Sequence, residues 1–263
     1  MLRGMRAVIA TRHGKEHVIA HVLAAADFTV QAVHIDTDRF GTFAGDVLRL
    51  LAPRDAAIAK ARAALAAEPT AHLGIGSEGT FGAVDTELVA LVHRSAPLVL
   101  VGRATGAIVR HGEHVTSLLG AEDAAERLGF PSAGVLVMTP ARELVLREVE
   151  DCGDLREAVE RTLVAHGAAW IEPDRRAHRD PARREVIAEA ARDVLVQLRD
   201  RCEACGAPGF VICEHELGLP CEACGAATSQ VAAFTRRCWA CGHRAQWHAP
   251  GPAALADCER CHP

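Results

Sequence analysis

Aromatic residues are scarce in this chain of 263 residues: tyrosine is absent, and seven phenylalanines and three tryptophans make up 4% of the composition. Proteins that bind single-stranded nucleic acid stack bases on aromatic side chains, and this chain has few of them. The chain also has no net positive charge: its formal net charge is −5 and its isoelectric point is near 6.3. Composition therefore argues against a generally basic nucleic-acid-binding protein, although a local basic patch stays open.

Long apolar runs are missing as well. The sequence has no run of about eighteen apolar residues, so we expect no membrane span and no membrane partner. The N-terminal segment MLRGMRAVIATRHGKE turns polar too early to form the core of a signal peptide. The sequence therefore predicts a cytoplasmic protein.

Hydrophobic residues amount to 49% of the chain, which is enough for a sizeable core. Strand and helix patterns alternate over residues 1–172, as in MRAVIAT (5–11), GKEHVIAHVLAAAD (14–27) and RDAAIAKARAALAAE (54–68). This alternation is typical of an α/β fold, and we expect a mixed sheet with flanking helices.

A further helix is predicted just before the cysteine-rich C-terminal part. Asp180 is a suitable N-cap, Pro181 suits the first helical turn, and apolar residues then recur at helical spacing. We therefore assign residues 1–200, with the helix over 181–200, to one α/β domain that binds a nucleotide or phosphate. Residues 201–263 are assigned to a small zinc-ribbon-like module.

The C-terminal module is defined by its cysteines. The chain has ten cysteines, and we expect no export signal, a combination that indicates metal binding rather than disulfides. Two CxxC pairs complete a tetrahedral Cys₄ site, so four pairs predict two structural zinc ions. The pairs are Cys202/Cys205, Cys221/Cys224, Cys238/Cys241 and Cys258/Cys261.

The sequence leaves the pairing of the four CxxC pairs open. Sequential pairing, first with second and third with fourth, gives loops of ordinary zinc-ribbon length, and an interleaved cross-brace is the alternative. Cys213 and His215 are spare candidate ligands, and we expect Cys213 to be a small buried residue of a strand. Cys152 is expected to be an inert core thiol. Closed Cys₄ sites have no open position for a substrate water, so we expect no zinc-based hydrolysis.

Polar residues follow two of the predicted strands. ATRHGKE carries Thr11 and Lys15 into a helix, and helix-start N–H groups with a lysine in the first turn form an anion site. LGIGSEGTFG places Ser77 and Glu78 between glycines at the end of a strand, where open α/β sheets bind ligands. A carboxylate there can hold Mg²⁺ or Mn²⁺, or orient a water.

Two neighbouring segments add further candidates. Asp55 and Lys60 lie five residues apart on the helix predicted over 54–68. The loop DTDRFGTFAGD ends at Asp46, whose carboxylate is a further candidate metal ligand.

Five arginines surround the start of the helix over 181–200, in the stretch RRAHRDPARREVI. Cations at a helix N-terminus oppose the helix dipole, so we expect a phosphate or polyphosphate among them, held by Arg179 and Arg183. His178 can hydrogen-bond a base or a sugar. The alternative is a solvated hinge in which neighbouring carboxylates neutralise the arginines; these are Asp174, Asp180 and Glu185.

Four of these segments, in this order, resemble motifs of the inosine/xanthosine triphosphate pyrophosphatase superfamily of house-cleaning enzymes. ATRHGKE is similar to its opening strand-and-turn motif, with His13 in place of an asparagine. RDAAIAKAR is similar to its acidic metal-binding region, and AHR (177–179) to its base-contacting SHR motif. GSEGTFG stands where the family has paired aspartates, with Glu78 as the closest carboxylate.

The chain as a whole is also similar to a bacterial family of unknown function. The shared motifs are GTF-x-G-[DE], SEG-[ST]-FG, RAHR-[ND]-P-x-R and the terminal CxxC pairs. This resemblance implies no established activity.

The sequence supports two functional hypotheses. The first, which the pyrophosphatase resemblance implies, is a Mg- or Mn-dependent hydrolase of a nucleoside triphosphate or related phosphorylated compound that releases pyrophosphate. Its catalytic residues would be Glu78, Asp46, Asp55 and Lys15. Its substrate-binding residues would be Thr11, His13, Lys15, Lys60, Ser77, His178, Arg179 and Arg183. The alternative is a zinc-containing protein that contacts a protein or, less favoured, nucleic acid without catalysis; a homodimer is a further possible assembly.

Overall fold

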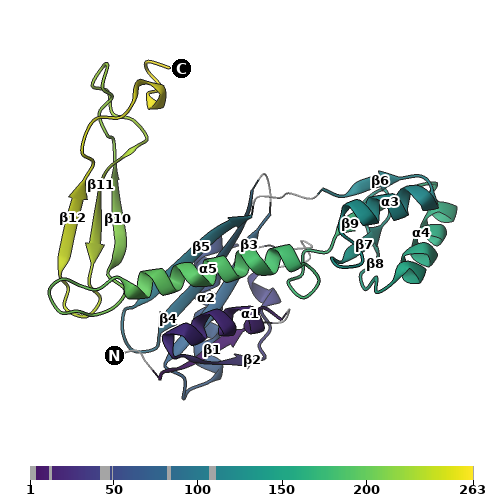
Figure 1. The fold of residues 1–263 in the computed structure, drawn as a ribbon, viewed down its shortest axis with the longest axis horizontal. Helices are drawn as coiled ribbons and strands as arrows, with labels where there is room; N and C mark the ends of the chain where they lie inside the picture. Colours follow the sequence, from purple (N-terminus) through teal and green to yellow (C-terminus); the bar gives the residue numbers. More distant parts are fainter. Residues whose placement is uncertain are drawn as a thin grey trace.

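The computed structural model describes residues 4–11, 14–41, 48, 50–81, 84–106 and 111–262. Two residues in the sequence hypotheses, His13 and Asp46, lie outside the described residues. The described strands form three sheets, which Figure 1 shows in a central α/β unit, a smaller α/β unit on one side and a β-rich module on the other.

The central sheet is mixed, with strand order β2-β1-β3-β4-β5. β1 pairs in parallel with β2 and β3, whereas β4 is antiparallel to both β3 and β5. The strands are β1 (Arg6–Ala10), β2 (Thr29–Val33), β3 (Leu73–Thr80), β4 (Asp85–His93) and β5 (Val99–Gly106). The mixed sheet expected from the sequence is thereby confirmed.

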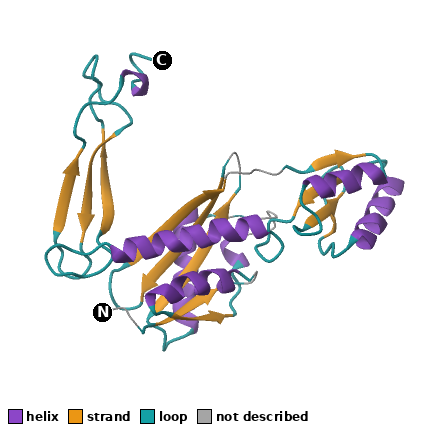
Figure 2. Ribbon diagram, viewed as in Figure 1, coloured by secondary structure: helices purple, strands orange, loops and turns teal. Residues whose placement is uncertain are grey.

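Helices cover both faces of the central sheet (Figure 2). They are α1 (Lys15–Leu23), α2 (Pro53–Ala67) and α5 (Pro181–Arg199). Ile9, Ile75 and Leu91 pack in one core cluster with residues of α1 and α5. Val8 and Ala90, each next in sequence to one of these, pack with α2 in a second cluster. The alternation of strand side chains therefore produces a three-layer α/β/α sandwich.

Two glycines allow helices to approach this sheet closely. A Cβ built on Gly76 of β3 would lie 2.1 Å from the carbonyl oxygen of Ala57 in α2. A Cβ built on Gly102 of β5 would lie 2.1 Å from the carbonyl oxygen of Ala190 in α5. Both distances are shorter than any van der Waals contact, so only glycine fits beneath either helix.

The long helix α5 begins as the sequence predicts. The side chain of Asp180 accepts a hydrogen bond from the Arg183 backbone N–H at 3.2 Å, and Pro181 occupies the first turn. Its apolar face, which includes Ile187 and Val194, is buried against the central sheet. Because α5 ends at Arg199, it delivers the chain directly to the first cysteine pair.

Residues 113–173 form a second α/β unit between β5 and α5. Its antiparallel sheet has the order β6-β9-β7-β8, and it has a hydrophobic core of its own. The elements are β6 (Glu113–Val115), α3 (Leu118–Arg127), β7 (Val135–Met138), β8 (Leu144–Leu146), α4 (Cys152–His166) and β9 (Ala169–Pro173). The domain assigned to residues 1–200 thus contains two sheets with separate cores.

The C-terminal module is an antiparallel sheet of β10 (Val211–Leu217), β11 (Val231–Arg237) and β12 (Arg244–His248), in that order. The predicted fold class, a mixed-sheet α/β protein with flanking helices and a small cysteine-rich module, is therefore confirmed. Among the described residues, none of the helices combines the length and apolar character that a membrane span requires.

Two expectations about single cysteines are wrong. Cys213 is exposed on β10, where its thiol lies 3.3 Å from the carbonyl oxygen of Thr235. Cys152 is exposed at the start of α4 rather than buried in a core. Every residue of β10 from Ile212 to Leu217 is exposed, and Cys152 lies on the first turn of α4, so both thiols face solvent.

We predict that Gly76→Ala destabilises the protein, because the added methyl group forces α2 away from β3. Overpacking of this kind costs about 1–3 kcal/mol. Denaturant unfolding would measure the change in the free energy of unfolding. Gly251→Ala is the control, since a Cβ there meets no atom within 4 Å among the described residues. Equal stability of the two variants would contradict the close packing.

Candidate functional site

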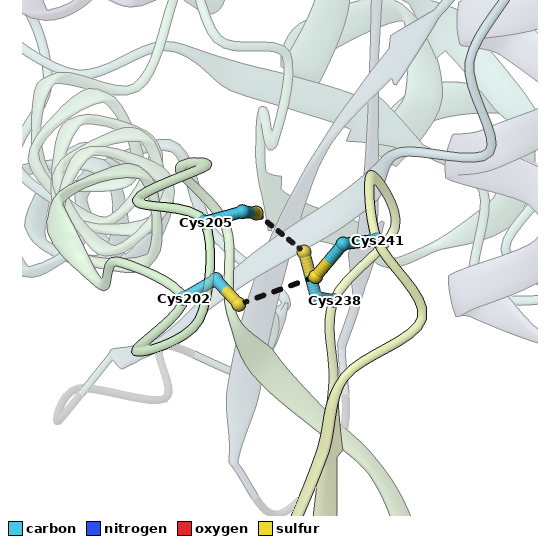
Figure 3. A group of neighbouring side chains, drawn as sticks. All are labelled: Cys202, Cys205, Cys238 and Cys241. Carbon is cyan, nitrogen blue, oxygen red and sulfur yellow. Dashed lines mark hydrogen bonds between the residues drawn. The ribbon is translucent and has the colours of Figure 1, made fainter.

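The eight CxxC cysteines gather in two groups of four. The first group is Cys202, Cys205, Cys238 and Cys241 (Figure 3), and the second is Cys221, Cys224, Cys258 and Cys261. Within each group the sulfur atoms lie within 4.8 Å of one another. The first pair therefore joins the third and the second joins the fourth, so the pairing is the interleaved cross-brace and not the sequential one.

The antiparallel sheet of the module explains this pairing. Val211 at the start of β10 pairs with Arg237 at the end of β11, so the segments before β10 and after β11 meet at one end of the sheet. The segment between β10 and β11 and the segment after β12 meet at the other end. Since CxxC pairs alternate with strands along the chain, every second pair reaches the same end.

The sulfur geometry fits a zinc ion at each end. A tetrahedral site with Zn–S bonds of about 2.3 Å has sulfur atoms about 3.8 Å apart. The Sγ atoms of Cys202 and Cys241 are 3.7 Å apart, and those of Cys205 and Cys238 are 3.6 Å apart. In the second group, the Cys224–Cys258 separation is 3.7 Å. Each group of four can therefore hold one zinc ion with all four positions filled by thiolates.

The first cysteine group also docks the module on the central unit. Trp239, between Cys238 and Cys241, packs against the central core and stacks on His93 with the rings 6.3 Å apart. Its indole N–H donates to the carbonyl oxygen of Pro208 at 2.7 Å. A metal ion in this group would therefore support the contact between the module and the central sheet.

A second candidate site, a cluster of charged side chains, lies where β1 and β3 end and β4 begins. Glu87 of β4 is 1% exposed, and its Oε1 accepts a hydrogen bond from Arg183 Nε of α5 at 2.6 Å. Lys15 Nζ, from the first turn of α1, lies 3.8 Å from Glu87 Oε2. Three elements thus bring one carboxylate and two cations together.

A lysine–glutamate pair extends the cluster. Lys60 Nζ of α2 lies 2.5 Å from Glu78 Oε2 of β3, and both side chains are almost fully buried. In the register of β3 and β4, Glu78 lies opposite Leu88, and Gly79 lies opposite Glu87. A Cβ on Gly79 would lie 2.5 Å from Glu87 Oε1, so glycine leaves the space that this carboxylate fills.

A third ion pair completes the cluster. Arg175 Nη1 bonds Asp85 Oδ2, and the Nη1 of Arg183 donates to the Arg175 carbonyl oxygen. Both guanidinium groups lie over the Phe81 ring, at 5.5 Å and 4.8 Å from its centre. Among the described residues, four cations of the cluster therefore face three carboxylates.

Burial and neighbouring charges shift two pKa values in the cluster. Burial, with Arg183 close by, lowers the pKa of the Lys15 ammonium from 10.5 to about 8. Burial alone would raise the pKa of the Glu87 carboxyl, but Lys15 and Arg183 outweigh it and hold that pKa below its ordinary value. Near neutral pH, Lys15 is therefore mostly protonated and Glu87 is ionised.

Three buried oxygen atoms in this region lack a hydrogen-bond partner within the described residues: Thr11 Oγ1, Asp85 Oδ1 and Glu87 Oε2. An unsatisfied buried polar atom costs free energy, and each such atom in a folded protein needs an explanation. A bound ligand, ion or water that supplies the missing partners is a direct explanation.

The lysines single out the same place. The chain has 29 lysines and arginines, of which only Lys15 and Lys60 are lysines. Both contribute to this cluster, and every other cation of these two types in the chain is an arginine. Lysine differs from arginine in its compact charge and in the readiness with which burial shifts its pKa.

The structure brings together only part of the residue set expected from the sequence. Lys15, Lys60, Glu78 and Arg183 belong to the cluster, and Ser77 is buried beside it on β3. Asp55 is exposed in the first turn of α2 and forms no hydrogen bond or ion pair with the described residues.

Arg179 and His178, which the sequence suggests for a phosphate site, lie at the margin of the charged cluster. Arg179 turns toward the second α/β unit, where its Nη2 donates to the Val149 carbonyl oxygen and its Nε is 4.0 Å from Asp174. His178 is exposed, and its Cβ would lie 3.6 Å from a Cβ on Gly14 at the start of α1. Protein groups thus contact much of the stretch RRAHRDPARREVI. The alternative with neighbouring carboxylates predicts such contacts, and Asp174, one of the carboxylates it names, makes them.

Sequence reasoning missed Asp85, Glu87 and Arg175. The first two stand in DTELVALVH, whose composition indicates an apolar strand. Positions 85, 87, 89 and 91 share one face of β4, and Val89 and Leu91 on that face are core residues. The period of two therefore marks Asp85 and Glu87 as buried acids.

Fold and sites together define a class: an α/β protein with a buried charged cluster beside parallel strand ends and a cross-braced module that can hold two zinc ions. The chain belongs to the DUF6671 family, described as a domain of unknown function, whose profile matches residues 60–263. The predicted membership of a family of unknown function is thus confirmed, while the likeness to pyrophosphatases stays a prediction.

Other comparisons add little. No curated protein matches the chain. The crystal structure of protein VC0702 from Vibrio cholerae aligns with a TM-score of 0.29 and 11% identity, over 40% of this chain and 57% of that chain. The present chain thus aligns with little more than half of that protein, and such an alignment supports no statement on function.

We predict that the double variant Cys205→Ser/Cys241→Ser retains one zinc ion per chain, because both thiolates belong to one interleaved site. Cys205→Ser/Cys224→Ser is the matched variant and should lose both ions, since it removes a ligand from each site. Native mass spectrometry would count the ions. The reverse result, with the first variant losing both ions and the second only one, would establish sequential pairing.

We also predict that Lys15 titrates with a pKa of about 8 in the folded protein. Labelling with [¹³Cε]lysine gives only two side-chain signals, since the chain has two lysines. Lys60→Arg assigns them, and an NMR titration between pH 6 and about 11 measures both. A Lys15 signal that titrates at its ordinary pKa of 10.5 would contradict the burial of this ammonium in a cationic cluster.

Proposed function

We propose that the central unit is a hydrolase that binds a nucleoside triphosphate, or a related phosphorylated compound, and releases pyrophosphate with the help of a divalent cation. The observation that carries this proposal is the buried cluster that gathers four cations, which among the described residues outnumber the carboxylates that contact them: Lys15, Lys60, Arg175 and Arg183.

An anion suits this cluster better than any other ligand. Among the described residues its cations outnumber its carboxylates, and the cluster is held away from water, where a phosphate would be strongly bound. The backbone N–H groups at the start of α1 add to this attraction, because Lys15 lies in the first turn. The carboxyl ends of parallel strands are also where open α/β sheets bind their ligands.

A divalent cation fits one carboxylate of the cluster. Mg²⁺ prefers oxygen ligands and is commonly bound by one or two carboxylates together with substrate phosphates. Asp85 would hold the ion, since its buried Oδ1 lacks a hydrogen-bond partner among the described residues. The free oxygen of Glu87 is less suitable, because Lys15 lies 3.8 Å from it and would repel a further cation. Bound there, the ion would neutralise phosphate charge.

Because cations outnumber carboxylates among the described residues of the cluster, we expect the divalent cation to arrive with the phosphates rather than before them. Glu78 and Asp55, which the sequence favoured as metal ligands, fit this role less well. Glu78 is paired with Lys60 at 2.5 Å, and Asp55 is exposed outside the cluster. The resemblance to inosine/xanthosine triphosphate pyrophosphatases supports the choice of a nucleoside triphosphate as substrate class.

A second candidate function is contact with a partner protein through the cysteine-rich module. Trp247 stacks on Phe234 with the rings 4.8 Å apart and is still 45% exposed, and Leu217 is 65% exposed. Exposed apolar side chains of this size favour a protein interface over nucleic acid. Loss of a co-purifying partner from Trp247→Ala, with both zinc ions retained, would support this function.

We predict pyrophosphate release from at least one member of a panel of ordinary and deaminated nucleoside triphosphates, with Mg²⁺ or Mn²⁺. Arg183→Met should lower kcat/KM by about 10²-fold or more, because a charge-assisted contact to phosphate is lost. Asp85→Asn should raise the Mg²⁺ concentration needed for half-maximal rate.

The matched control is Arg192→Met, which changes an exposed arginine on the same helix. It should leave the rate unchanged. If folded, zinc-loaded wild-type protein released neither pyrophosphate nor phosphate from any nucleotide, the hydrolase proposal would fail.

A further inference from the structure

We propose that zinc loading of the first cysteine group controls how tightly the charged cluster binds its phosphate ligand. The inference rests on the proposed function, because it takes the cluster to be a phosphate site. It adds a regulator to that site, namely a zinc ion held where the cysteine-rich module docks on the central unit.

A helix and a strand of the central unit run from the charged cluster to the first cysteine group (Figure 1). Helix α5 places Arg183 in the cluster and ends at Arg199, just before the first cysteine pair. Its 19 residues make it about 28 Å long. Strand β4 places Glu87 in the cluster and ends at His93, on which Trp239 of the first cysteine group stacks. Both elements therefore contact both sites.

Contacts at the start, in the middle and at the end of α5 hold this helix on the sheet. At its start, Arg183 Nε donates to Glu87 Oε1 at 2.6 Å. In its middle, α5 lies so close to Gly102 of β5 that a Cβ there would be 2.1 Å from the helix backbone. At its end, Arg236 of β11 donates to the carboxylate of Asp200 at 2.7 Å. The contact at the end requires a folded module.

Apolar contacts join the module to the same end of the central sheet. Trp239 and Val211 pack against the core cluster that contains the buried face of α5. Gly209 lies beside the strand β5, where a Cβ on it would be 2.9 Å from Leu98 Cδ1 and 3.3 Å from Leu100 Cδ2. These contacts also require that the segments around the first cysteine group keep their folded conformation.

Zinc loading supplies the two states that such control requires. A small metal site seldom keeps its structure without the ion, so we expect loss of zinc to unfold the segments that carry the ligands. The local core there is small among the described residues, and Cys202 and Cys238 are part of it. Without zinc, α5 would be held at its start and middle only, and Arg183 would be less firmly placed. Because a preorganised site binds more tightly, the cluster would then bind phosphate more weakly.

The second cysteine group provides an internal comparison. It offers the same four thiols but lies at the other end of the module sheet. Figure 1 shows that this end of the module, which carries the C-terminus, points away from the central unit. Loss of zinc from the second group should therefore leave the docked end of the module, and with it the charged cluster, unchanged.

The test measures pyrophosphate binding by isothermal titration calorimetry with two matched variants of the full chain. Cys205→Ser/Cys241→Ser removes two ligands of the first group, and Cys224→Ser/Cys261→Ser removes two ligands of the second. Each variant should keep one zinc ion, which native mass spectrometry verifies before and after the titration. The first should bind pyrophosphate about fivefold more weakly or worse, the lower end of usual coupling between sites, whereas the second should bind like wild type.

A variant of Trp239 separates docking of the module from zinc binding itself. Trp239→Ala removes the contact with His93 and keeps all eight cysteines, so both zinc ions should remain. It should nevertheless weaken pyrophosphate binding, because the docked end of the module is loosened. Trp239→Phe keeps an aromatic ring at this position and should restore most of the affinity.

The outcomes separate this inference from the proposed function. Equal pyrophosphate affinity in the two cysteine variants would overturn control by the first group and leave the hydrolase proposal intact. If zinc-loaded wild-type protein bound no pyrophosphate, the phosphate site on which both proposals rest would be refuted.

Hydrogen exchange of the wild-type protein decides the matter if Cys205→Ser/Cys241→Ser does not fold. Coupling between two sites is reciprocal, so pyrophosphate should stabilise the docked end of the module. It should slow exchange of the backbone amides in residues 238–243 and leave those in residues 221–229 unchanged. Unchanged exchange in residues 238–243 at saturating pyrophosphate would overturn the inference.

Discussion

The buried ion pair between Arg183 and Glu87 is the interaction on which most of this structure depends. It joins the start of α5 to β4 at 2.6 Å, with Lys15 of α1 close to the same carboxylate. Because α5 runs from this point across the sheet and ends beside Cys202, the pair fixes one end of the helix that carries the zinc-ribbon-like module. Removal of one partner from such a pair costs about 3–5 kcal/mol, since it leaves a buried charge uncompensated.

Stability alone does not explain why the charges are there. Replacement of a whole buried ion pair by well-packed apolar residues is often neutral or stabilising. This chain keeps three such pairs at one place, along with carboxylate oxygens that have no hydrogen-bond partner among the described residues. Shifted pKa values and unsatisfied polar atoms concentrate at functional sites, and both occur here. The cluster is therefore better understood as a ligand site whose partner supplies the missing contacts than as a stabilising network.

The sequence predicts single helices and strands more readily than it predicts which strands pair with one another. The alternation of strands and helices is sufficient to predict the mixed α/β fold, and the segment ATRHGKE contains Lys15, which the structure places in the charged cluster. Which strands share a sheet depends on contacts between distant residues, so the separate sheet of residues 113–173 could not be foreseen. The cysteine pairing was within reach, because CxxC pairs that alternate with antiparallel strands must fall at alternate ends. Composition alone does not reveal Glu87, whose burial follows only from the period of two in its strand.

The cross-brace also explains how so small a module can be folded at all. Its buried side chains near the first cysteine group are few, and two of them, Cys202 and Cys238, are themselves metal-ligand candidates. A sheet of three strands with so little apolar core needs another source of stability, and metal binding can supply it. Each interleaved site closes a loop that contains two strands, β10 and β11 for the first site and β11 and β12 for the second. Each ion would therefore restrict more of the chain than it would in a sequential site. Since Trp239 lies within the first site and packs on the central core, a metal ion there would order the module and its junction with the central unit together.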